Sequence, residues 1–177
     1  MTSKYLYINT IGCQMNVYDS EQIAMGLAHL GYQQTSSLET ADLVILNTCA
    51  VRAKAEQKAF SFLGRLARLK KKKPGLIVGV GGCVAQQEGA KMLERVPHLD
   101  LVFGTRAIHR LPALVRKIEN KRCRIVDVSM SENSDLSDMA SGVSYENQVS
   151  RFVTIMRGCD NFCTYCVVPH VRGRETS

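Results

Sequence analysis

The sequence predicts an α/β fold built on a doubly wound, mostly parallel sheet of about five strands. Over the first 129 residues, short β-rich or continuously apolar segments alternate with longer segments of helical periodicity. The segment at 43–47, LVILN, begins with consecutive apolar residues, which is typical of a strand covered by helices on both faces. Alternation of this kind predicts a parallel sheet of the flavodoxin or Rossmann type.

Each predicted element follows from its local pattern. Strands are expected at 4–10, 43–47, 76–80, 101–103 and, more weakly, 124–128. Helices are expected at about 16–30, 51–73 and 85–95, with a fourth that has Pro112 in its first turn. Gly31 and Pro74 follow the first two helices and are typical of residues that end a helix. The spacing of the first helix places Val17 on its buried face.

The chain is predicted to have three parts. Residues 1–129 carry the alternating pattern, and residues 130–150 contain acidic side chains but no lysine or arginine. This second stretch is rich in serine and asparagine, so it is predicted to be a flexible or partly ordered linker. The last part, 151–177, opens with the apolar segment FVTIM at 152–156, which is predicted to be the first strand of another domain.

Length, composition and charge exclude several classes of protein. The chain has 177 residues, 45% of them hydrophobic, which is enough for one domain with a core and part of another. No apolar run approaches the ~18 residues of a membrane helix, and the first residues lack the apolar centre of a signal peptide. We therefore expect a cytoplasmic protein with no membrane partner. The formal net charge of +7 favours an anionic partner such as nucleic acid without establishing one.

Three cysteines near the C-terminal end form a compact C-x-x-x-C-x-x-C loop: Cys159, Cys163 and Cys166. Three thiolates suit a cubane iron–sulfur cluster in which one iron is open to another ligand. The simpler alternatives are a structural metal knuckle or a reactive thiol loop. An odd total of 7 cysteines in a chain with no secretory segment also favours metal ligation over disulfides.

Three other cysteines have equivalent places in the predicted sheet. Cys13 follows the first strand, Cys49 the second and Cys83 the third. The carboxyl ends of parallel strands meet at one edge of a sheet, where open α/β proteins bind their ligands. We therefore expect the three thiols to converge on a second metal centre; the alternative is that they are buried apolar cysteines. Cys123 lies outside both sets and is predicted to be a free thiol.

Four motifs, in order along the chain, resemble the radical S-adenosylmethionine (radical SAM) methylthiotransferases. They are TIGCQMNVYDSE around Cys13, NTCAVRAKAEQKAFSFLGRL around Cys49, GGCVAQ around Cys83 and RGCDNFCTYCVVPHVRGRE at the C-terminal end. Within the family, they are most similar to the branch that methylthiolates carbon 2 of isopentenyl-adenosine beside the anticodon of tRNA. Close alternatives are the branches that act on threonylcarbamoyl-adenosine of tRNA or on an aspartate of a ribosomal protein.

The resemblance implies a cofactor for each cysteine triplet. It implies that the strand-end triplet holds an auxiliary 4Fe–4S cluster and that the C-terminal triplet holds the 4Fe–4S cluster that binds S-adenosyl-L-methionine. Tyr165 is implied to lie near the adenine of S-adenosyl-L-methionine, and the alternative for Tyr165 is a core aromatic. The implied partners are isopentenylated tRNA, through its anticodon loop, and a reductant protein. The whole enzyme is expected to be a monomer.

The family continues beyond the segment seen here, into most of a radical-SAM barrel and a small β-rich RNA-binding domain. We therefore expect residues 151–177 to be the start of the barrel and this chain by itself to be inactive. A non-enzymatic iron–sulfur or flavin electron-transfer module is the alternative from another class. Against a flavin module, no G-x-G-x-x-G or Walker motif opens a predicted helix.

Basic residues gather at two predicted helix ends. Arg65, Arg68 and the run 70–73 close the second helix, and a further group at 116–124 follows the fourth. Cations at a helix carboxyl end stabilise the helix dipole, so a solvated terminus is one interpretation. If tRNA is the substrate, some of these side chains would contact phosphates.

Overall fold

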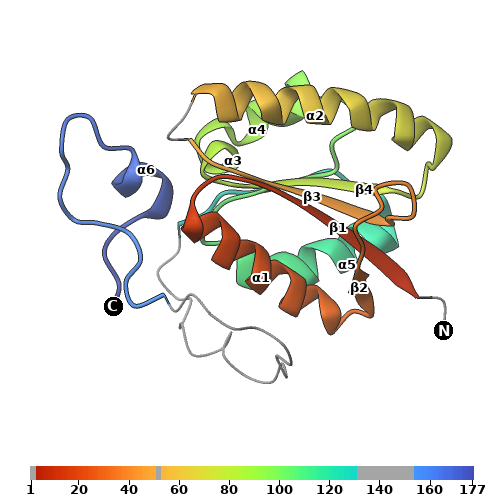
Figure 1. Cartoon of the computed structure of the whole chain (residues 1–177), viewed down its shortest axis with the longest axis horizontal. Coiled ribbons are helices and arrows are strands. Elements are labelled where there is room, and N and C mark those ends of the chain that lie inside the picture. Colours follow the sequence, from red (N-terminus) through yellow and green to blue (C-terminus); the bar gives the residue numbers. More distant parts are fainter. Residues whose placement is uncertain (1–2, 51–52, 131–153) are drawn as a thin grey trace.

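A six-stranded parallel sheet forms the centre of the fold in the computed structural model, which describes residues 3–50, 53–130 and 154–177 (Figure 1). The strands lie in the order β2-β1-β3-β4-β5-β6, and each pair of neighbours is parallel. The predicted doubly wound α/β fold is therefore confirmed. The strand bounds are β1 Lys4–Ile11, β2 Tyr32–Gln34, β3 Leu43–Thr48, β4 Ile77–Gly82, β5 Leu101–Phe103 and β6 Ile125–Asp127.

The strand that the sequence did not predict is β2, at one edge of the sheet. It has three residues, YQQ, of which only Tyr32 is buried. A strand this short has no room for the alternating apolar pattern that identifies longer strands. It forms because its backbone pairs in parallel with β1, from Lys4 opposite Tyr32 to Leu6 opposite Gln34. Tertiary pairing, and not local sequence, decides this strand.

Helices cover both faces of the sheet. Figure 1 shows α1 and α5 on one face and α2, α3 and α4 on the other. In β3, Leu43 and Ile45 pack with the α1 and α5 side, whereas Val44 and Leu46 pack with the α2 side. The prediction that this strand is covered on both faces is therefore confirmed. The helix bounds are α1 Gln14–Ala28, α2 Ala53–Lys72, α3 Cys83–Glu88, α4 Ala90–Arg95, η1 (a 3-10 turn) Ile108–Arg110, α5 Leu111–Lys121 and α6 Val168–Arg172.

Two helix predictions were wrong in detail. The single helix expected at 85–95 is two short helices, α3 and α4, which are separated at Gly89, where φ is +52°. Val17 is 41% exposed, although its spacing placed it on the buried face of α1. The first turns of α1 instead bury Asn16 and Asp19 against the sheet. A polar network, described below, takes the place of the predicted apolar face in the first turns of α1, whereas Ile23 and Leu27 are buried as the spacing predicted.

Part of the predicted C-terminal organisation cannot be compared with the structure. Residues 131–150 of the predicted linker and residues 152–153 of the predicted strand lie outside the described residues. The remainder of that strand prediction was wrong, because residues 154–156 belong to no helix or strand. Among the residues that are described, no helix has both the length and the apolar content needed to cross a membrane.

A bidentate ion pair joins η1 to the last strand, β6. Arg110 donates from Nε to Asp127 Oδ2 at 2.7 Å and from Nη2 to Asp127 Oδ1 at 2.8 Å. The hydroxyl of Ser129 donates to the same Oδ1 at 2.8 Å. The hydrogen bonds from Arg110, followed by those from Ser129, hold the pKa of Asp127 below its usual value despite partial burial. Folding therefore favours the ionised carboxylate at this site.

We predict that Asp127→Asn lowers the free energy of unfolding by about 1–2 kcal/mol at pH 7. An unfolded aspartate titrates near pH ~3.9, and the folded pKa is lower, so this stabilisation is present above about pH 4 and is lost as the pH falls through the folded pKa. Urea unfolding at pH 7 and near pH 3 should show that the difference in free energy of unfolding between wild type and variant is smaller at the lower pH. Glu39→Gln, which neutralises an exposed carboxylate, is the control. An equal gap at both pH values would contradict the ion-pair explanation.

Candidate functional site

Three neighbouring strands end in the same register. Ile11 of β1 pairs with Thr48 of β3, and Thr48 pairs with Gly82 of β4. Cys49 and Cys83 directly follow the paired residues Thr48 and Gly82. Cys13 lies two residues after Ile11. The strands that precede the three cysteines are therefore adjacent, as predicted, and the cysteines follow them at one edge of the sheet.

The three side chains differ in their exposure at this edge. Cys13 is exposed at the N-terminal end of α1, whereas Cys49 and Cys83 are 4% and 6% exposed. Within the described ranges, no group of three His, Cys, Asp or Glu side chains is arranged to hold a metal ion. The structure thus brings the three backbone positions to one edge, and the assignment of their sulfurs as ligands stays a prediction.

A buried asparagine joins the first cysteine turn to the second. Asn16 is fully buried in the first turn of α1, and its Oδ1 accepts a hydrogen bond from the backbone N–H of Cys13 at 3.1 Å. Its Nδ2 donates to Asn47 Oδ1 and to the carbonyl oxygen of Thr48, each at 3.1 Å. These two acceptors directly precede Cys49 along the chain. One amide therefore sets the position of α1 relative to the end of β3.

Further hydrogen bonds extend this network to the third turn. The Thr48 hydroxyl donates to the carbonyl oxygen of Gly81 at 2.7 Å, one residue before Gly82. Asn47 Nδ2 donates to the Asn16 carbonyl at 2.8 Å and to the Ser20 hydroxyl at 2.9 Å. All of these side chains are buried. The network ties the three cysteine turns together through satisfied polar groups.

The residue before Cys83 must be glycine. Gly82 has φ +90°, a conformation that other residues rarely adopt. A Cβ atom at this position would lie 2.3 Å from the carbonyl oxygen of Thr48. The backbone of Gly82 therefore lies too close to the end of β3 to leave room for a side chain where the chain turns into α3.

An ion pair from the C-terminal segment is buried beside the same edge. Arg172, in α6, places Nη2 2.7 Å from Asp19 Oδ2 of α1, and the two side chains are 7% and 5% exposed. The helix α6 packs against α3, which begins at Cys83. Burial raises the pKa of the Cys83 thiol, and the Arg172 guanidinium beside it opposes that increase. The edge therefore has a buried ion pair whose guanidinium lies next to a buried thiol.

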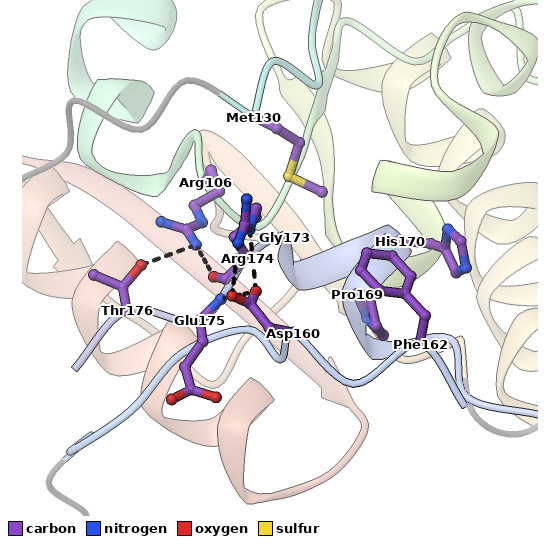
Figure 2. Close-up of a pocket in the computed structure, with 10 residues that line it drawn as sticks. All are labelled: Arg106, Met130, Asp160, Phe162, Pro169, His170, Gly173, Arg174, Glu175 and Thr176. Atoms are coloured by element: carbon purple, nitrogen blue, oxygen red, sulfur yellow. Dashed lines mark hydrogen bonds and ion pairs between the residues drawn. The ribbon is translucent and has the colours of Figure 1, made fainter.

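Two residues after β5 hold the C-terminal segment to the sheet domain. Thr105 donates from its hydroxyl to the Val171 carbonyl at 2.6 Å. Arg106 donates from Nε to the Arg172 carbonyl at 3.1 Å. It also donates from Nη2 to the Arg174 carbonyl at 2.8 Å (Figure 2). These bonds bridge elements 66–68 residues apart in sequence. They set where the C-terminal cysteine loop lies relative to the strand-end cysteines.

The C-terminal loop is closed by backbone hydrogen bonds. The N–H of Arg157 donates to the Thr176 carbonyl, and the N–H of Thr176 to the Arg157 carbonyl, each at 2.8 Å. Cys163 is exposed, and Cys159 and Cys166 are partly buried. Beside them, Tyr165 is 90% exposed. Tyr165 is therefore not part of the core formed by the described residues.

A hollow of about 510 Å³ lies between this loop and the sheet domain (Figure 2). On its floor, Asp160 accepts hydrogen bonds from Arg174 at 2.9 and 3.2 Å and from the backbone N–H of Glu175 at 2.9 Å. The Arg174 hydrogen bonds are the largest cause that lowers the pKa of Asp160 to about 2. The hollow therefore has fixed charges of both signs. Its lining residues are Arg106, Met130, Asp160, Phe162, Pro169, His170, Gly173, Arg174, Glu175 and Thr176.

A family model described as "Uncharacterized protein family UPF0004" matches residues 5–104, a span that includes the three strand-end cysteines and the whole network around them. The chain belongs to this family.

Relatives in this comparison carry a functional name. The chain is 55% identical over 98% of its length to a protein of Desulfosudis oleivorans named tRNA-2-methylthio-N(6)-dimethylallyladenosine synthase. Proteins with the same name from Geobacter sulfurreducens and Geotalea uraniireducens are 55% and 56% identical over 99% and 98% of the chain. The resemblance predicted from the motifs is confirmed. The chain spans 37–39% of the length of these three relatives.

Among solved structures, the chain is similar to an orphan response regulator of H. pylori. The match covers 66% of this chain and 97% of that one, with 22% identity and a TM-score of 0.44. A similarity of this size is too low for any inference.

The sequence did not point to the residues that support the site. Asn16, Asp19 and Asn47 lie inside the two motifs around Cys13 and Cys49, which was the one available signal. A lone asparagine or aspartate has no spacing that distinguishes a buried partner from a solvated side chain. Arg106 lies in no motif at all, and its partners are far along the chain. Only the folded structure shows these contacts.

We predict that Gly82→Ala destabilises the protein by at least ~2 kcal/mol, because the new Cβ requires both a strained φ and a displaced strand end. Gly64→Ala is the matched control. Gly64 lies within α2 with no atom within 4 Å of an added Cβ, so its replacement should stabilise the helix by about 0.5–1 kcal/mol. Urea unfolding followed by circular dichroism measures both. A Gly82→Ala variant as stable as wild type would show that the Gly82 conformation is not required.

We also predict that Asn16→Ala lowers the free energy of unfolding by about 2–3 kcal/mol. The change removes two donated hydrogen bonds and the two that Asn16 Oδ1 accepts from the backbone N–H and the thiol of Cys13, and it leaves Asn47 Oδ1 without that partner. Asn120→Ala, at an exposed position of α5, should change it by less than ~0.5 kcal/mol. Equal losses for the two asparagines would argue against the network as a support of the site.

Proposed function

We propose that this chain is the N-terminal part of a radical-SAM enzyme that methylthiolates carbon 2 of isopentenyl-adenosine next to the anticodon of tRNA. One observation carries this proposal. Relatives with more than half of their aligned residues identical over nearly the whole chain are named tRNA-2-methylthio-N(6)-dimethylallyladenosine synthase. The shared segment includes both cysteine triplets, one of which follows three adjacent strands.

In this proposal, Cys13, Cys49 and Cys83 hold an auxiliary 4Fe–4S cluster in the domain formed by residues 1–129. The donor chemistry fits, because thiolates are the ligands that iron–sulfur clusters use. Cys13 is the N-cap of the fifteen-residue helix α1, and the positive end of a helix dipole attracts an anionic group. The buried guanidinium of Arg172 beside Cys83 supplies a charge opposite to that of the thiolates. Both features support an anionic group at this edge.

The second 4Fe–4S cluster is held in this proposal by the C-terminal triplet, Cys159, Cys163 and Cys166. Three thiolates would ligate three of the four irons and leave the fourth for S-adenosyl-L-methionine. Residues 130–150 are then a linker, and residues 151–177 are the start of the barrel. Tyr165 is proposed to contact the adenine of S-adenosyl-L-methionine, and its 90% exposure leaves the ring accessible to a ligand.

When bound, the two clusters and S-adenosyl-L-methionine supply the radical chemistry and the sulfur that an unactivated aromatic carbon requires. The residues of this chain position those groups. The Asn16 amide fixes the Cys13 and Cys49 turns, and Arg106 fixes the C-terminal segment against the sheet domain. The whole enzyme is proposed to be a cytoplasmic monomer that receives electrons from a reductant protein.

Iron analysis after anaerobic reconstitution tests the strand-end ligands. We predict that Cys13→Ser, Cys49→Ser and Cys83→Ser each remove about four iron and four sulfide per chain. Cys123→Ser is the matched control and should leave both unchanged, because Cys123 lies beside α5, away from the strand-end cysteines. Loss of a cluster in the Cys123 variant would show that the ligands are misassigned. A reconstituted protein that holds flavin instead would favour the electron-transfer alternative.

The substrate is tested with the whole enzyme, and the chain itself is tested beside it. Mass spectrometry should detect methylthio-isopentenyl-adenosine after incubation of the whole enzyme with isopentenylated tRNA, S-adenosyl-L-methionine, reductant and a sulfur source. This 177-residue chain should form none. A product only with threonylcarbamoyl-adenosine tRNA, or only with ribosomal protein, would replace the proposed substrate with that of a related branch.

A further inference from the structure

Four exposed cations follow one face of α2: Lys58, Arg65, Arg68 and Lys72. Their separations of seven, three and four residues place them within an arc of about 80° on a helix with ~3.6 residues per turn. At ~1.5 Å per residue, this basic stripe is about 21 Å long. It begins close to the cysteine edge, because α2 is the helix that follows Cys49.

The stripe residues differ from two nearby lysines, Lys70 and Lys73, which form ion pairs within the fold. Lys70 forms an ion pair with Asp100, and Lys73, just after the helix, pairs with Asp42 at 2.7 Å and donates to a backbone carbonyl at 2.9 Å. Their charges are thus used within the fold. In the part of the chain that the structure describes, none of the four stripe residues takes part in an ion pair. Their charges face solvent.

No acidic side chain of α2 lies beside the stripe. Glu56 is the acidic residue of the helix, and its place in the helical repeat is about 165° from the centre of the stripe. It lies 3.9 Å from Arg95 of α4, on the other side of α2. The helix itself therefore places no negative charge beside the stripe.

A groove of about 490 Å³ runs between the stripe and β1. Lys58 and Arg65 form one wall together with Ser61, and Asn9 and Ile11 of β1 form the other. The groove exists because α2 covers β1 incompletely: Tyr5 is 38% exposed, and Tyr7 and Asn9 are half-buried.

One aromatic residue, Phe62, lines this groove, and it is 5% exposed. Tyr7 stacks on Phe62 with ring centroids 6.4 Å apart, and the Arg65 guanidinium lies 5.4 Å from the centre of the Phe62 ring. The groove therefore offers cations at its rim and the amides of Asn9 and Gln57 within it. Cations of this kind contact phosphates, and amides contact base edges.

We propose that the basic stripe and the adjacent groove bind a single-stranded segment of RNA. This inference rests on the proposed function, in which tRNA is the substrate, and adds the surface of this chain that contacts it. A length of ~21 Å matches about six nucleotides of a strand that keeps helical stacking, at ~3.4 Å each. The proposed function supplies RNA as the anionic partner, and the groove adds amide groups that can contact base edges, so RNA is the occupant to which we assign this surface. The end of the stripe at Lys58 then holds the RNA beside the cysteine edge.

Neutralising single cations tests the proposal. The probes are a fluorescein-labelled anticodon stem–loop and labelled oligouridine, titrated with the 177-residue chain at several salt concentrations. We expect Lys58→Gln, Arg65→Gln, Arg68→Gln and Lys72→Gln each to weaken binding about fivefold at ~0.1 M salt. Each should also reduce the slope of log affinity against log salt by about 0.7. Because all four side chains are exposed, the unfolding temperature serves as the check that each variant folds.

Lys71→Gln is the matched control. Lys71 is exposed on the same helix and carries the same charge, but lies about 100° from the centre of the stripe. It should change affinity less than twofold. A loss equal to that of the stripe variants would overturn the proposal, because net charge alone would then explain binding. The proposal also fails if the stripe variants weaken binding to polyglutamate but not to RNA, which would indicate an acidic protein partner.

Activity of the whole enzyme separates this inference from the proposed function. Stripe variants that keep their iron content but have a raised KM for tRNA would support both the RNA-binding stripe and the proposed function. If the wild-type enzyme modifies tRNA while its stripe variants show an unchanged KM, the stripe proposal is wrong and the proposed function stands. If the chain binds RNA through the stripe and the whole enzyme modifies no tRNA, the proposed function is wrong and the RNA surface stands.

Discussion

The common end point of β1, β3 and β4 is the constraint on which the candidate site depends. Parallel pairing places Ile11, Thr48 and Gly82 side by side, so the three chain segments leave the sheet at one edge. A shift of one strand by one residue would turn its side chains to the opposite face and move its cysteine away from the others. Register therefore decides whether three cysteines distant in sequence belong to one site.

This edge is built differently from the remainder of the sheet. The middle of β3 is packed with aliphatic side chains on both faces, whereas its end carries Asn47 and Thr48, which are just as deeply buried. Burial of such groups is costly unless each has a partner. Here Asn16 and Ser20 of α1 provide the partners, so α1 gives up part of an apolar face. The result is a polar, hydrogen-bonded support beneath the cysteine turns, where aliphatic packing would leave the backbone less strictly placed.

The helix α2 links the two surfaces to which we assign function. It begins just after Cys49, at the edge where the cysteine turns lie, and carries the basic stripe from Lys58 to Lys72 toward the opposite edge. On the other side of the cysteine edge, Arg106 and Arg172 hold the C-terminal segment through backbone carbonyls and Asp19. The cysteine edge thus lies between a surface suited to RNA and the loop that carries the second cysteine triplet.

Local pattern was enough to predict the fold class, the order of the longer strands and helices, and the strand-end position of the cysteines. Apolar runs and helical periodicity are properties of neighbouring residues, so β3 and α2 could be predicted from the sequence. By itself, the sequence also determined the two cysteine triplets and the family, because both are written as short motifs. Contacts between distant residues are another matter. Tertiary structure alone decided four features. They are the edge strand β2, the network around Asn16, the burial of Arg172, and which lysines of α2 form ion pairs and which face solvent. Each depends on which groups meet across more than 20 residues of chain, and no local spacing encodes that meeting.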